Sequence, residues 1–353
     1  MAENPLNEPI VIWGAGAIGG TLGAYWARAG TDVLLVDIAR DHVEACRISG
    51  LSIEGPIDAF TQKVPAVTPA ELRGRFSRIV LAVKAQHTPE ALATLAPHLR
   101  EDGFVLSAQN GLNEITIART IGEARTMGCF VNFGADWLGP GRIMFGNRGA
   151  VVVGEIDGGV RERTRAMQEL LKLFEPEAVL TDDIWGYLWG KLAYGAMLFG
   201  TALTDDSMSV NFADPKRLPV WLALGREVVA VAQARGVRPR GFGEFDPDAF
   251  RPEAPDSEGR RVVAWLADYT SRTAKTHSGI HRDLAVRKRK TEVDPQIGII
   301  GELAREKGLR TPVLDCLVTL IHDVEDGRRP LAIETLNELL ATCKSDSTPA
   351  SSS

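Results

Sequence analysis

A glycine-rich turn between an apolar strand and a helical segment is the feature that most constrains the fold of this 353-residue chain. Residues 10–13 read Ile-Val-Ile-Trp, which favours a buried strand, and a helical pattern follows the turn to about residue 29. The turn has the GxGxxG spacing and consists of Gly14, Ala15, Gly16, Ala17, Ile18 and Gly19. In this context the first glycine permits a tight turn, the second lets the backbone approach a pyrophosphate, and the third allows close helix–strand packing. The pattern therefore predicts a dinucleotide site at residues 14–19, the alternative being a glycine-rich turn without a ligand.

The residue that ends the second predicted strand, 33–36, is Asp37. A carboxylate at this position can accept hydrogen bonds from the ribose hydroxyls of an adenosine. It would also repel a 2′-phosphate, since like unit charges about 4 Å apart repel by ~4 kcal/mol at an effective dielectric constant of 20. Asp37 therefore favours NAD(H), unless it is only a solvated acid at a strand end. Arg40 could neutralise a phosphate, so NADP(H) stays open.

The distribution of strand and helix patterns predicts two domains. Further strands are expected at 79–83, 104–108 and 150–153, with helical segments between several of them, which indicates a doubly wound parallel sheet. From residue 183 on, only helices are expected, at 185–203, 220–234, 260–275, 292–307 and 314–323. We therefore expect a dinucleotide-binding α/β domain at 1–182, an all-α domain at 183–343 and a disordered serine-rich tail at 344–353. The stretch 236–259, rich in Pro, Gly and Asp, is expected to be a surface excursion.

Composition and charge exclude several classes of protein. The net charge of −6 is the opposite of the basic footprint of a nucleic-acid binder. The four cysteines include no CxxC pair, which fits reduced thiols rather than a disulfide framework or a structural zinc site. Neither a signal peptide nor an apolar run of about 18 residues is recognisable. We expect a cytoplasmic protein with a small-molecule partner, no membrane or nucleic-acid partner, and a homodimer as an open alternative.

Several short motifs follow one another along the chain. They are the glycine turn, 81–85 (Leu-Ala-Val-Lys-Ala), 109–111 (Gln-Asn-Gly), 139–142 (Gly-Pro-Gly-Arg), 189–192 (Trp-Gly-Lys-Leu) and 290–294 (Lys-Thr-Glu-Val-Asp). With these motifs the chain resembles the ketopantoate reductase (2-dehydropantoate 2-reductase) family over nearly its whole length. The resemblance implies a Rossmann-like domain, a helical domain of the phosphogluconate-dehydrogenase type, and an active site between them. It also implies hydride transfer from NAD(P)H to a 2-oxo acid.

The resemblance also implies roles for two ionisable residues. Lys191 would be the general acid that protonates the oxygen when a ketone is reduced, and the base in the reverse reaction. Its predicted helix is otherwise apolar and aromatic, and desolvation there would lower the lysine pKa from about 10.4 towards the working pH. Glu292 would orient Lys191 or the substrate hydroxyl. The structural alternatives are that the Lys191 side chain only extends to the surface and that Glu292 is an ordinary acid at a helix N-terminus.

Three further residues are implied to bind ligands. Lys84 follows a predicted strand at its carboxyl end, where open α/β sheets bind ligands, and matches the family's lysine that faces the cofactor and substrate. Asn110 matches the residue near the nicotinamide ribose and the substrate oxygen, although an Asn before Gly is also typical of a plain turn. Ser278 corresponds to the serine that holds the substrate carboxylate.

The chain departs from the family pattern on the helix of Lys191. The family carries asparagines four and eight residues after the lysine, whereas this chain has Gly195 and Phe199. A pocket that loses two hydrogen-bonding partners must change its preference, so ketopantoate itself becomes doubtful. We expect a bulkier or aromatic 2-oxo or hydroxy acid, anchored by basic groups of the 275–287 stretch. The groups considered for this role are Lys275, His277, His281, Arg282 and Arg287.

Some alternatives stay open. His277 and His281 lack a clear third ligand, so no metal is predicted. The enzyme could instead oxidise a larger hydroxy compound in a catabolic pathway. In a different class, the chain could be a dinucleotide sensor without turnover, although Lys191, Glu292 and Asn110 together argue against this.

Overall fold

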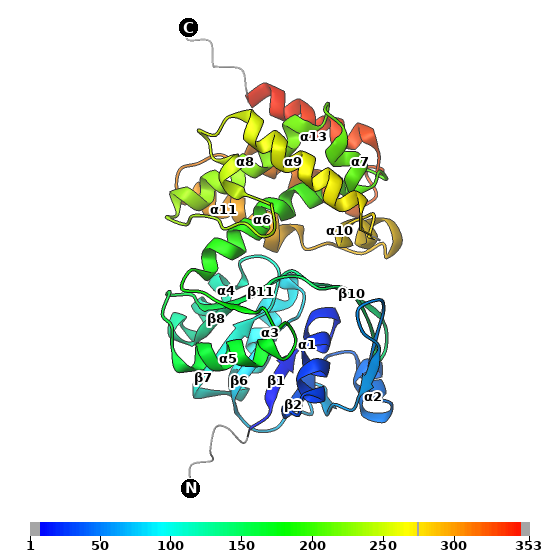
Figure 1. The fold of residues 1–353 in the computed structure, drawn as a ribbon, viewed down its shortest axis with the longest axis vertical. Coiled ribbons are helices and arrows are strands. Elements are labelled where there is room, and N and C mark those ends of the chain that lie inside the picture. Colours follow the sequence, from blue (N-terminus) through cyan, green and yellow to red (C-terminus); the bar gives the residue numbers. More distant parts are fainter. Residues whose placement is uncertain (1–7, 274, 347–353) are drawn as a thin grey trace. The chain divides into compact units, whose positions relative to one another are not determined.

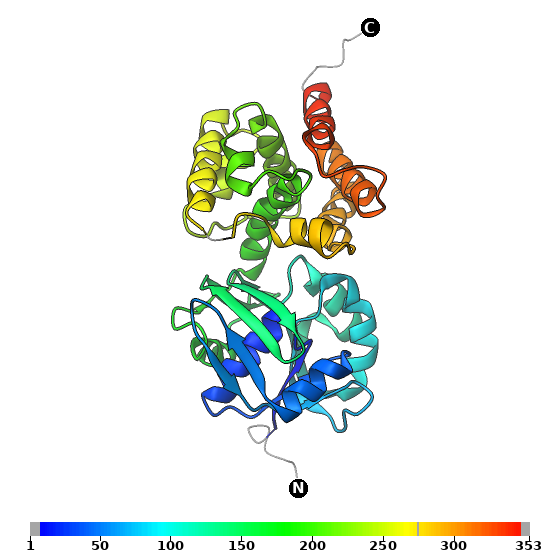
Figure 2. The same ribbon diagram turned by 90° about the vertical axis from the view of Figure 1, so that its right-hand side faces the viewer.

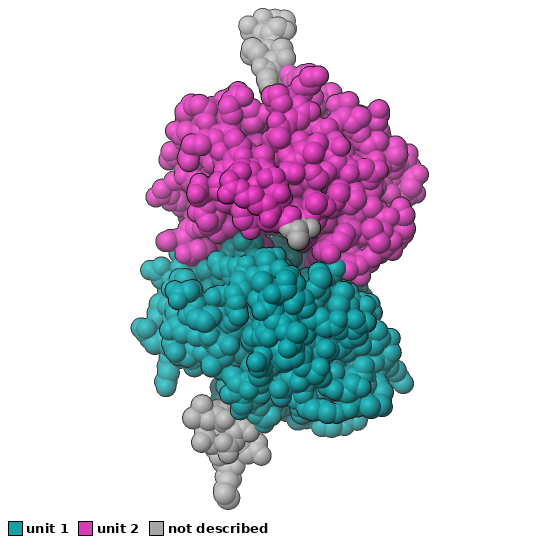
Figure 3. All heavy atoms as spheres, turned by 45° about the vertical axis from the view of Figure 1, so that its right-hand side comes forward, with its two compact units in different colours: residues 1–184 teal, residues 185–353 magenta. Residues whose placement is uncertain are grey.

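The computed structural model describes residues 8–273 and 275–346. The chain divides into two compact units, Met1–Ile184 and Trp185–Ser353, which are coloured separately in Figure 3. Each unit is described by itself below.

Unit 1 is built on an eight-stranded sheet with the order β12-β11-β8-β7-β6-β1-β2-β5 (Figure 1). Its strands are β1 (Ile10–Trp13), β2 (Val33–Val36), β5 (Ala66–Val67), β6 (Phe76–Leu81), β7 (Leu99–Ser107), β8 (Thr126–Val131), β11 (Val151–Glu155) and β12 (Val179–Leu180). Neighbouring strands are parallel except β8 and β11, which are antiparallel. Parallel neighbours need crossover connections, and helices supply most of them.

Helices cover both faces of this sheet. They are α1 (Ala17–Arg28), α2 (Arg40–Ile48), α3 (Thr88–Leu95), α4 (Asn113–Ile121) and α5 (Glu162–Lys172). Because side chains alternate along a strand, Ile10 and Ile12 of β1 join a core cluster with residues of α1 and α5. Val11 and Trp13 join a second cluster with residues of α3 and α4. This arrangement confirms the predicted doubly wound sheet, which is parallel as predicted except at the β8–β11 pair.

A second, four-stranded sheet was not predicted. It has the order β4-β3-β10-β9 and consists of β3 (Leu51–Glu54), β4 (Phe60–Gln62), β9 (Gly134–Gly139) and β10 (Arg142–Asn147). Helix α1 packs against all four of these strands as well as against β1 and β2, so it lies between the two sheets (Figure 2). Tyr25 of α1 packs edge-on against Phe60 and Phe145, at ring-centroid distances of 5.1 and 5.9 Å.

Unit 2 is helical, as predicted. Its helices are α6 (Ile184–Thr201), α7 (Met208–Ala213), α8 (Leu218–Ala234), α9 (Asp256–Ser271), α10 (Gly279–His281), α11 (Ile299–Arg305), α12 (Pro312–Glu325) and α13 (Ile333–Asp346). Two π-helical turns, Arg282–Val286 and Asp294–Gly298, adjoin α10 and α11. Within the described part of this unit, an isolated bridge between Phe242 and Phe245 is the one β-type pairing. Helices α7 and α13 were not predicted.

Two expectations for unit 2 need correction. The stretch 236–259 is not merely a surface excursion, because Phe245 and Phe250 are 1% and 0% exposed and their rings stack at 5.8 Å. The predicted tail at 344–353 begins too early, since α13 continues through residue 346, and 347–353 lie outside the described residues. No helix in the described ranges is long and apolar enough to cross a bilayer.

Candidate functional site

The predicted cofactor residues of unit 1 meet at one edge of the large sheet. Trp13, the last residue of β1, pairs with Val36 of β2 and with Leu81 of β6. Leu81 in turn pairs with Ser107 of β7. The segments that follow these strand ends are the glycine turn, Asp37, the 82–84 segment and the 108–110 segment, and they therefore lie along the same carboxyl edge. This is the edge at which open α/β sheets bind ligands.

The three glycines of the turn occupy different environments. Gly14 has φ +100°, and a Cβ there would lie 2.7 Å from the backbone nitrogen of Val83, so only glycine fits. A Cβ on Gly19 would lie 2.1 Å from the carbonyl oxygen of Gly14, which explains the close packing of α1 on β1. A Cβ on Gly16 would meet nothing within 4 Å. The turn is therefore tight where it touches protein and open at Gly16.

The open side of the turn presents backbone donors. Gly16 is the N-cap residue of α1 and has no side-chain cap. Within the described chain, its own N–H has no hydrogen-bond partner. The first turn of α1 contains no acidic residue. Because a helix N-terminus carries partial positive charge, this arrangement fits a pyrophosphate group.

Asp37 lies directly beside the turn. Its Oδ2 accepts a hydrogen bond from the backbone N–H of Ala15 at 2.9 Å, and its Oδ1 accepts one from Ala39 at 2.9 Å. The half-buried carboxylate is thus held in one orientation at the end of β2. Arg40 is exposed at the start of α2 and forms no ion pair with any described residue.

A buried polar network supports the segments that carry Lys84 and Asn110. The Gln109 side-chain amide donates to Thr88 Oγ1 and to the carbonyl of Val83, the residue before Lys84, both at 2.8 Å. Thr88 donates to Asn113 Oδ1 at 3.0 Å, and Asn113 Nδ2 donates to the Asn110 carbonyl at 2.7 Å. Strand β6 ends at residue 81, so Lys84 lies in the following turn and not at the strand end itself. Sequence reasoning missed Thr88 and Asn113, whose types are ordinary at helix N-termini.

In unit 2, α6 presents a half-exposed face that contains Lys191 and Gly195. A Cβ on Gly195 would meet nothing within 4 Å, so the space beside it is open. Phe199, expected to line the same pocket, is instead 0% exposed and belongs to the core. The reason is helical phase, since a residue eight positions on lies about 80° further around the helix.

An unpredicted segment, 240–245, lies along α6 next to this face. The Arg240 N–H donates to the Gly186 carbonyl at 2.7 Å, and a Cβ on Gly190 would lie 1.9 Å from the Arg240 carbonyl oxygen. Further along, the ring of Tyr194 packs against Phe242 at 5.8 Å. Burial raises the pKa of Tyr194, which keeps the phenol neutral. The helix face of Lys191 therefore has an aromatic border.

Glu292 and Ser278 have defined local positions. Glu292 is half-buried and precedes the helical segment that begins at residue 293. Next to it, the N–H and hydroxyl of Thr291 both donate to Glu325 of α12 at 2.7 Å, which anchors this part of the chain. Ser278 is 3% exposed and caps α10, because its Oγ accepts the His281 N–H at 3.1 Å.

The predicted histidines form a pair around Asp205. The rings of His277 and His281 are 4.3 Å apart. His277 Nε2 lies 3.0 Å from the Asp205 carbonyl, and His281 Nε2 lies 3.3 Å from its carboxylate. Burial lowers the pKa of His281, although the hydrogen bond to Asp205 opposes this shift, so the environment favours the neutral ring. Lys275 is exposed.

The basic run at 287–290 is partly structural. Arg287 and Arg289 both donate to Asp283 Oδ1 at 3.0 Å, and Asp283 is 3% exposed. A buried carboxylate requires such partners. In the described ranges, no group of three or more His, Cys, Asp or Glu side chains is arranged to hold a metal ion.

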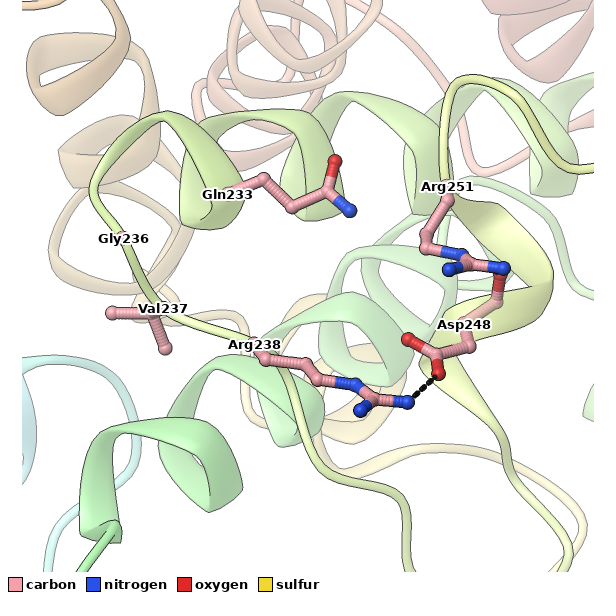
Figure 4. A pocket seen from close by; sticks show the side chains of 6 residues that line it. All are labelled: Gln233, Gly236, Val237, Arg238, Asp248 and Arg251. Carbon is pink, nitrogen blue, oxygen red and sulfur yellow. Dashed lines mark hydrogen bonds and ion pairs between the residues drawn. The ribbon is translucent and has the colours of Figure 1, made fainter.

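Unit 2 also has a surface pocket. It is lined by Gln233, Gly236, Val237, Arg238, Asp248 and Arg251 (Figure 4). An ion pair between Arg238 and Asp248 crosses it. None of the predicted catalytic or binding residues contributes to this pocket.

Comparison with known proteins covers most of the chain. Residues 10–158 match the family model described as ketopantoate reductase PanE/ApbA, and residues 183–325 match the model of its C-terminal part. A 2-dehydropantoate 2-reductase of Pyrococcus horikoshii is 33% identical over 90% of this chain and 97% of its own length.

Two solved structures are similar in fold. A ternary complex of D-mandelate dehydrogenase with NADH and anilino(oxo)acetate aligns with a TM-score of 0.79 and 22% identity, over 91% of this chain and 99% of that chain. A dimeric ketopantoate reductase from Staphylococcus aureus aligns with a TM-score of 0.68 and 18% identity, over 91% and 100%.

Proposed function

Because this chain belongs to the ketopantoate reductase PanE/ApbA family, whose members are oxidoreductases acting on a CH–OH/C=O pair, we propose that it reduces a 2-oxo acid bulkier than ketopantoate, with NADH as the preferred reductant. The observation that carries the proposal is the face of α6, where Lys191 stands next to the open space at Gly195. The lysine provides the chemistry, and the missing side chain provides room for a larger substituent.

The proposed chemistry needs a proton donor on the protein. The nicotinamide, when bound, supplies the hydride to the carbonyl carbon. Lys191 donates a proton to the carbonyl oxygen as negative charge develops there, which yields the 2-hydroxy acid. In the reverse reaction the neutral amine of Lys191 takes the hydroxyl proton. Glu292 is the proposed carboxylate that orients Lys191 or the substrate hydroxyl.

The preference for NADH rests on Asp37. Both of its oxygens accept backbone N–H bonds, so the carboxylate cannot swing away from the position that a 2′-phosphate would need. The related D-mandelate dehydrogenase structure contains NADH, which supports the same choice. Lys84 and Asn110 are proposed to contact the cofactor and the substrate from the supported segments of unit 1.

The substrate class follows from shape and polarity. The space at Gly195 lacks the amide group of the family pattern, and the preceding residue on α6, Tyr194, packs its ring against Phe242. Apolar and aromatic walls favour a 2-oxo acid with a branched or aryl substituent. The anilino(oxo)acetate in the D-mandelate dehydrogenase complex is an aromatic oxo acid derivative, which supports this class. Ser278 and Lys275 are the proposed partners of the substrate carboxylate.

The decisive experiment is a matrix of cofactors and substrates. NADH and NADPH are each tested with ketopantoate, branched 2-oxo acids and phenylglyoxylate, and NAD⁺ with the corresponding hydroxy acids. We expect the highest kcat/KM with NADH and a bulky or aryl oxo acid. A clear preference for ketopantoate would refute the substrate proposal, and tight NADH binding without any turnover would indicate a sensor.

The proposed assembly is a homodimer. The Staphylococcus aureus relative is described as dimeric. Light scattering after size exclusion distinguishes a dimer from a 38.2 kDa monomer.

A further inference from the structure

We propose that His42 is a positioning residue for the cofactor. Through the carbonyl of Ala15, it holds the Ala15–Gly16 peptide so that the Gly16 N–H faces the pyrophosphate. This inference rests on the proposed binding of a nicotinamide dinucleotide at the glycine turn. No sequence motif singled out His42.

The hydrogen bonds of His42 define which ring nitrogen carries the proton. His42 lies on α2 and is 1% exposed. The N–H of Gly141 donates to its Nδ1 at 2.9 Å. Because a backbone N–H can only donate, Nδ1 is the acceptor and the ring proton is on Nε2. Nε2 lies 2.8 Å from the Ala15 carbonyl oxygen and therefore donates to it.

This bond determines where the next N–H points. In a trans peptide the C=O and N–H groups point in opposite directions, and the described chain contains no cis peptide. The Ala15 carbonyl points to His42, inside the protein, so the Gly16 N–H points the other way. Among the described residues the Gly16 N–H has no hydrogen-bond partner, and a Cβ on Gly16 would meet nothing within 4 Å, so the turn is open at this residue. The donor is thus aimed at the open side of the turn, where the pyrophosphate is proposed to bind.

Ala15 is held from two sides. Its N–H donates to Asp37 Oδ2 at 2.9 Å, while its C=O accepts from His42. The peptide on either side of this residue therefore has a fixed orientation before any ligand arrives. A ligand that needs the Gly16 N–H finds it already in place, which is what preorganised binding requires.

The hairpin of the small sheet supports the imidazole from behind. Gly141 lies in the turn between β9 and β10 with φ +70°, and a Cβ there would lie 2.9 Å from the Cβ of Ala45 on α2. Glycine at this position therefore lets the hairpin approach α2 closely enough to reach the ring. The Trp137 ring of β9 lies 6.4 Å from the His42 ring, in an edge-on arrangement. The Gly-Pro-Gly-Arg motif thus gains a role in the cofactor site, through His42.

Two substitutions at His42 separate positioning from packing. His42→Leu keeps an apolar volume but leaves the Ala15 carbonyl and the Gly141 N–H without partners. His42→Gln can still donate to one and accept from the other. We expect His42→Leu to raise the Kd for NADH about 10- to 100-fold, the range set by losing an oriented hydrogen bond. At saturating NADH its kcat should stay within about threefold of wild type, because no group near the reacting atoms has changed.

The loss of affinity in His42→Leu should depend on the phosphate groups of the ligand and not on its nucleoside. We expect His42→Leu to weaken ADP-ribose as much as NADH and to leave adenosine binding unchanged, measured by calorimetry. His42→Gln should recover most of the lost affinity. The matched control is Val43→Ala, which removes methyl groups from the buried neighbour on α2, 2% exposed, and should lower Tm without changing the Kd for NADH.

An unchanged Kd for NADH in folded His42→Leu would overturn the proposal, as would equal losses for adenosine and ADP-ribose. If the leucine variant does not fold, ¹⁵N NMR of the wild-type imidazole decides. A ring protonated only at Nε2, with and without ADP-ribose, supports the proposal, and a proton on Nδ1 refutes it. If the wild-type protein bound no dinucleotide, the proposed function itself would be refuted. The binding measurements test this independently of turnover.

Discussion

The choice between NADH and NADPH can be tested by removing the carboxylate of Asp37. The change Asp37→Ser deletes the negative charge at the end of β2 while leaving a small polar side chain. We expect the ratio of the NADPH and NADH dissociation constants to fall towards one. Absolute affinities are a poorer guide, because the same carboxylate also accepts the N–H groups of Ala15 and Ala39.

The size of the effect follows from the position of the charge. A 2′-phosphate about 4 Å from the carboxylate would be repelled by ~1 kcal/mol in bulk water and by ~4 kcal/mol at an effective dielectric constant of 20. Asp37 is half-buried, so the penalty lies between these limits. Since each 1.4 kcal/mol is about a factor of ten, the wild type should discriminate against NADPH by roughly 5- to 1000-fold. In Asp37→Ser the ratio of the NADPH and NADH dissociation constants should lose most of this factor and approach one.

The assay is calorimetric titration of both nucleotides into wild type and variant, at two salt concentrations. A charge effect weakens as salt rises, whereas a change of turn geometry does not. Asp41→Ser is the matched control, because Asp41 is an exposed carboxylate on α2 that, among the described residues, accepts a hydrogen bond only from the backbone N–H of His42. An Asp37→Ser variant that keeps the wild-type ratio, or a control that changes it equally, would show that the discrimination has another source.

Three other variants have defined outcomes. Lys191→Ala should lower kcat by about 10²–10⁴ with an unchanged Kd for NADH, and unaltered turnover would remove it as the acid. Gly195→Asn should fold normally, because its Cβ meets nothing within 4 Å, and should shift relative kcat/KM towards ketopantoate by about tenfold or more in the substrate panel. Tyr25→Phe tests a contribution to stability. Burial and the hydrogen bond to Asp58 raise the pKa of Tyr25 to about 12 in the folded state. The neutral phenol therefore stabilises the folded state below pH 10, and this advantage over phenylalanine is lost as the pH rises from 10 to 12. Urea unfolding at pH 8 and pH 11 checks the last prediction, and an equal wild-type advantage at both values would contradict it.

Local patterns in the sequence predicted five of the eight strands of the large sheet, whereas β5, β8 and β12 were not predicted. The apolar run before the glycine turn and the alternation of strands with helices are properties of adjacent residues, so β1, β2 and the helical character of unit 2 could be inferred. The small sheet could not, because Ser52 of β3 pairs with Arg142 of β10 across a long stretch of chain. Pairing between distant segments leaves little trace in either segment alone.

The candidate site shows the same division. The glycines of the turn have the environments that their spacing predicts, whereas Phe199 is buried in the core, since it lies about 80° around the helix from Lys191. The network of Thr88 and Asn113, and the two bonds of His42, depend on tertiary contacts between residue types that are common anywhere. Such partners become visible only in the folded chain.

The placement of α1 between two sheets has a thermodynamic consequence for binding. A Cβ on Gly20 would lie 2.4 Å from Ile143 of the small sheet, and one on Gly23 would lie 2.8 Å from Ile12 of the large sheet. Each of these glycines destabilises the helix by about 1 kcal/mol relative to alanine, but their lack of a side chain lets both sheets pack closely against the helix. Its first turn therefore has little conformational entropy left to lose. A dinucleotide that binds there would show a small heat-capacity change and little slowing of amide exchange in α1, because the helix is already rigid in the free protein.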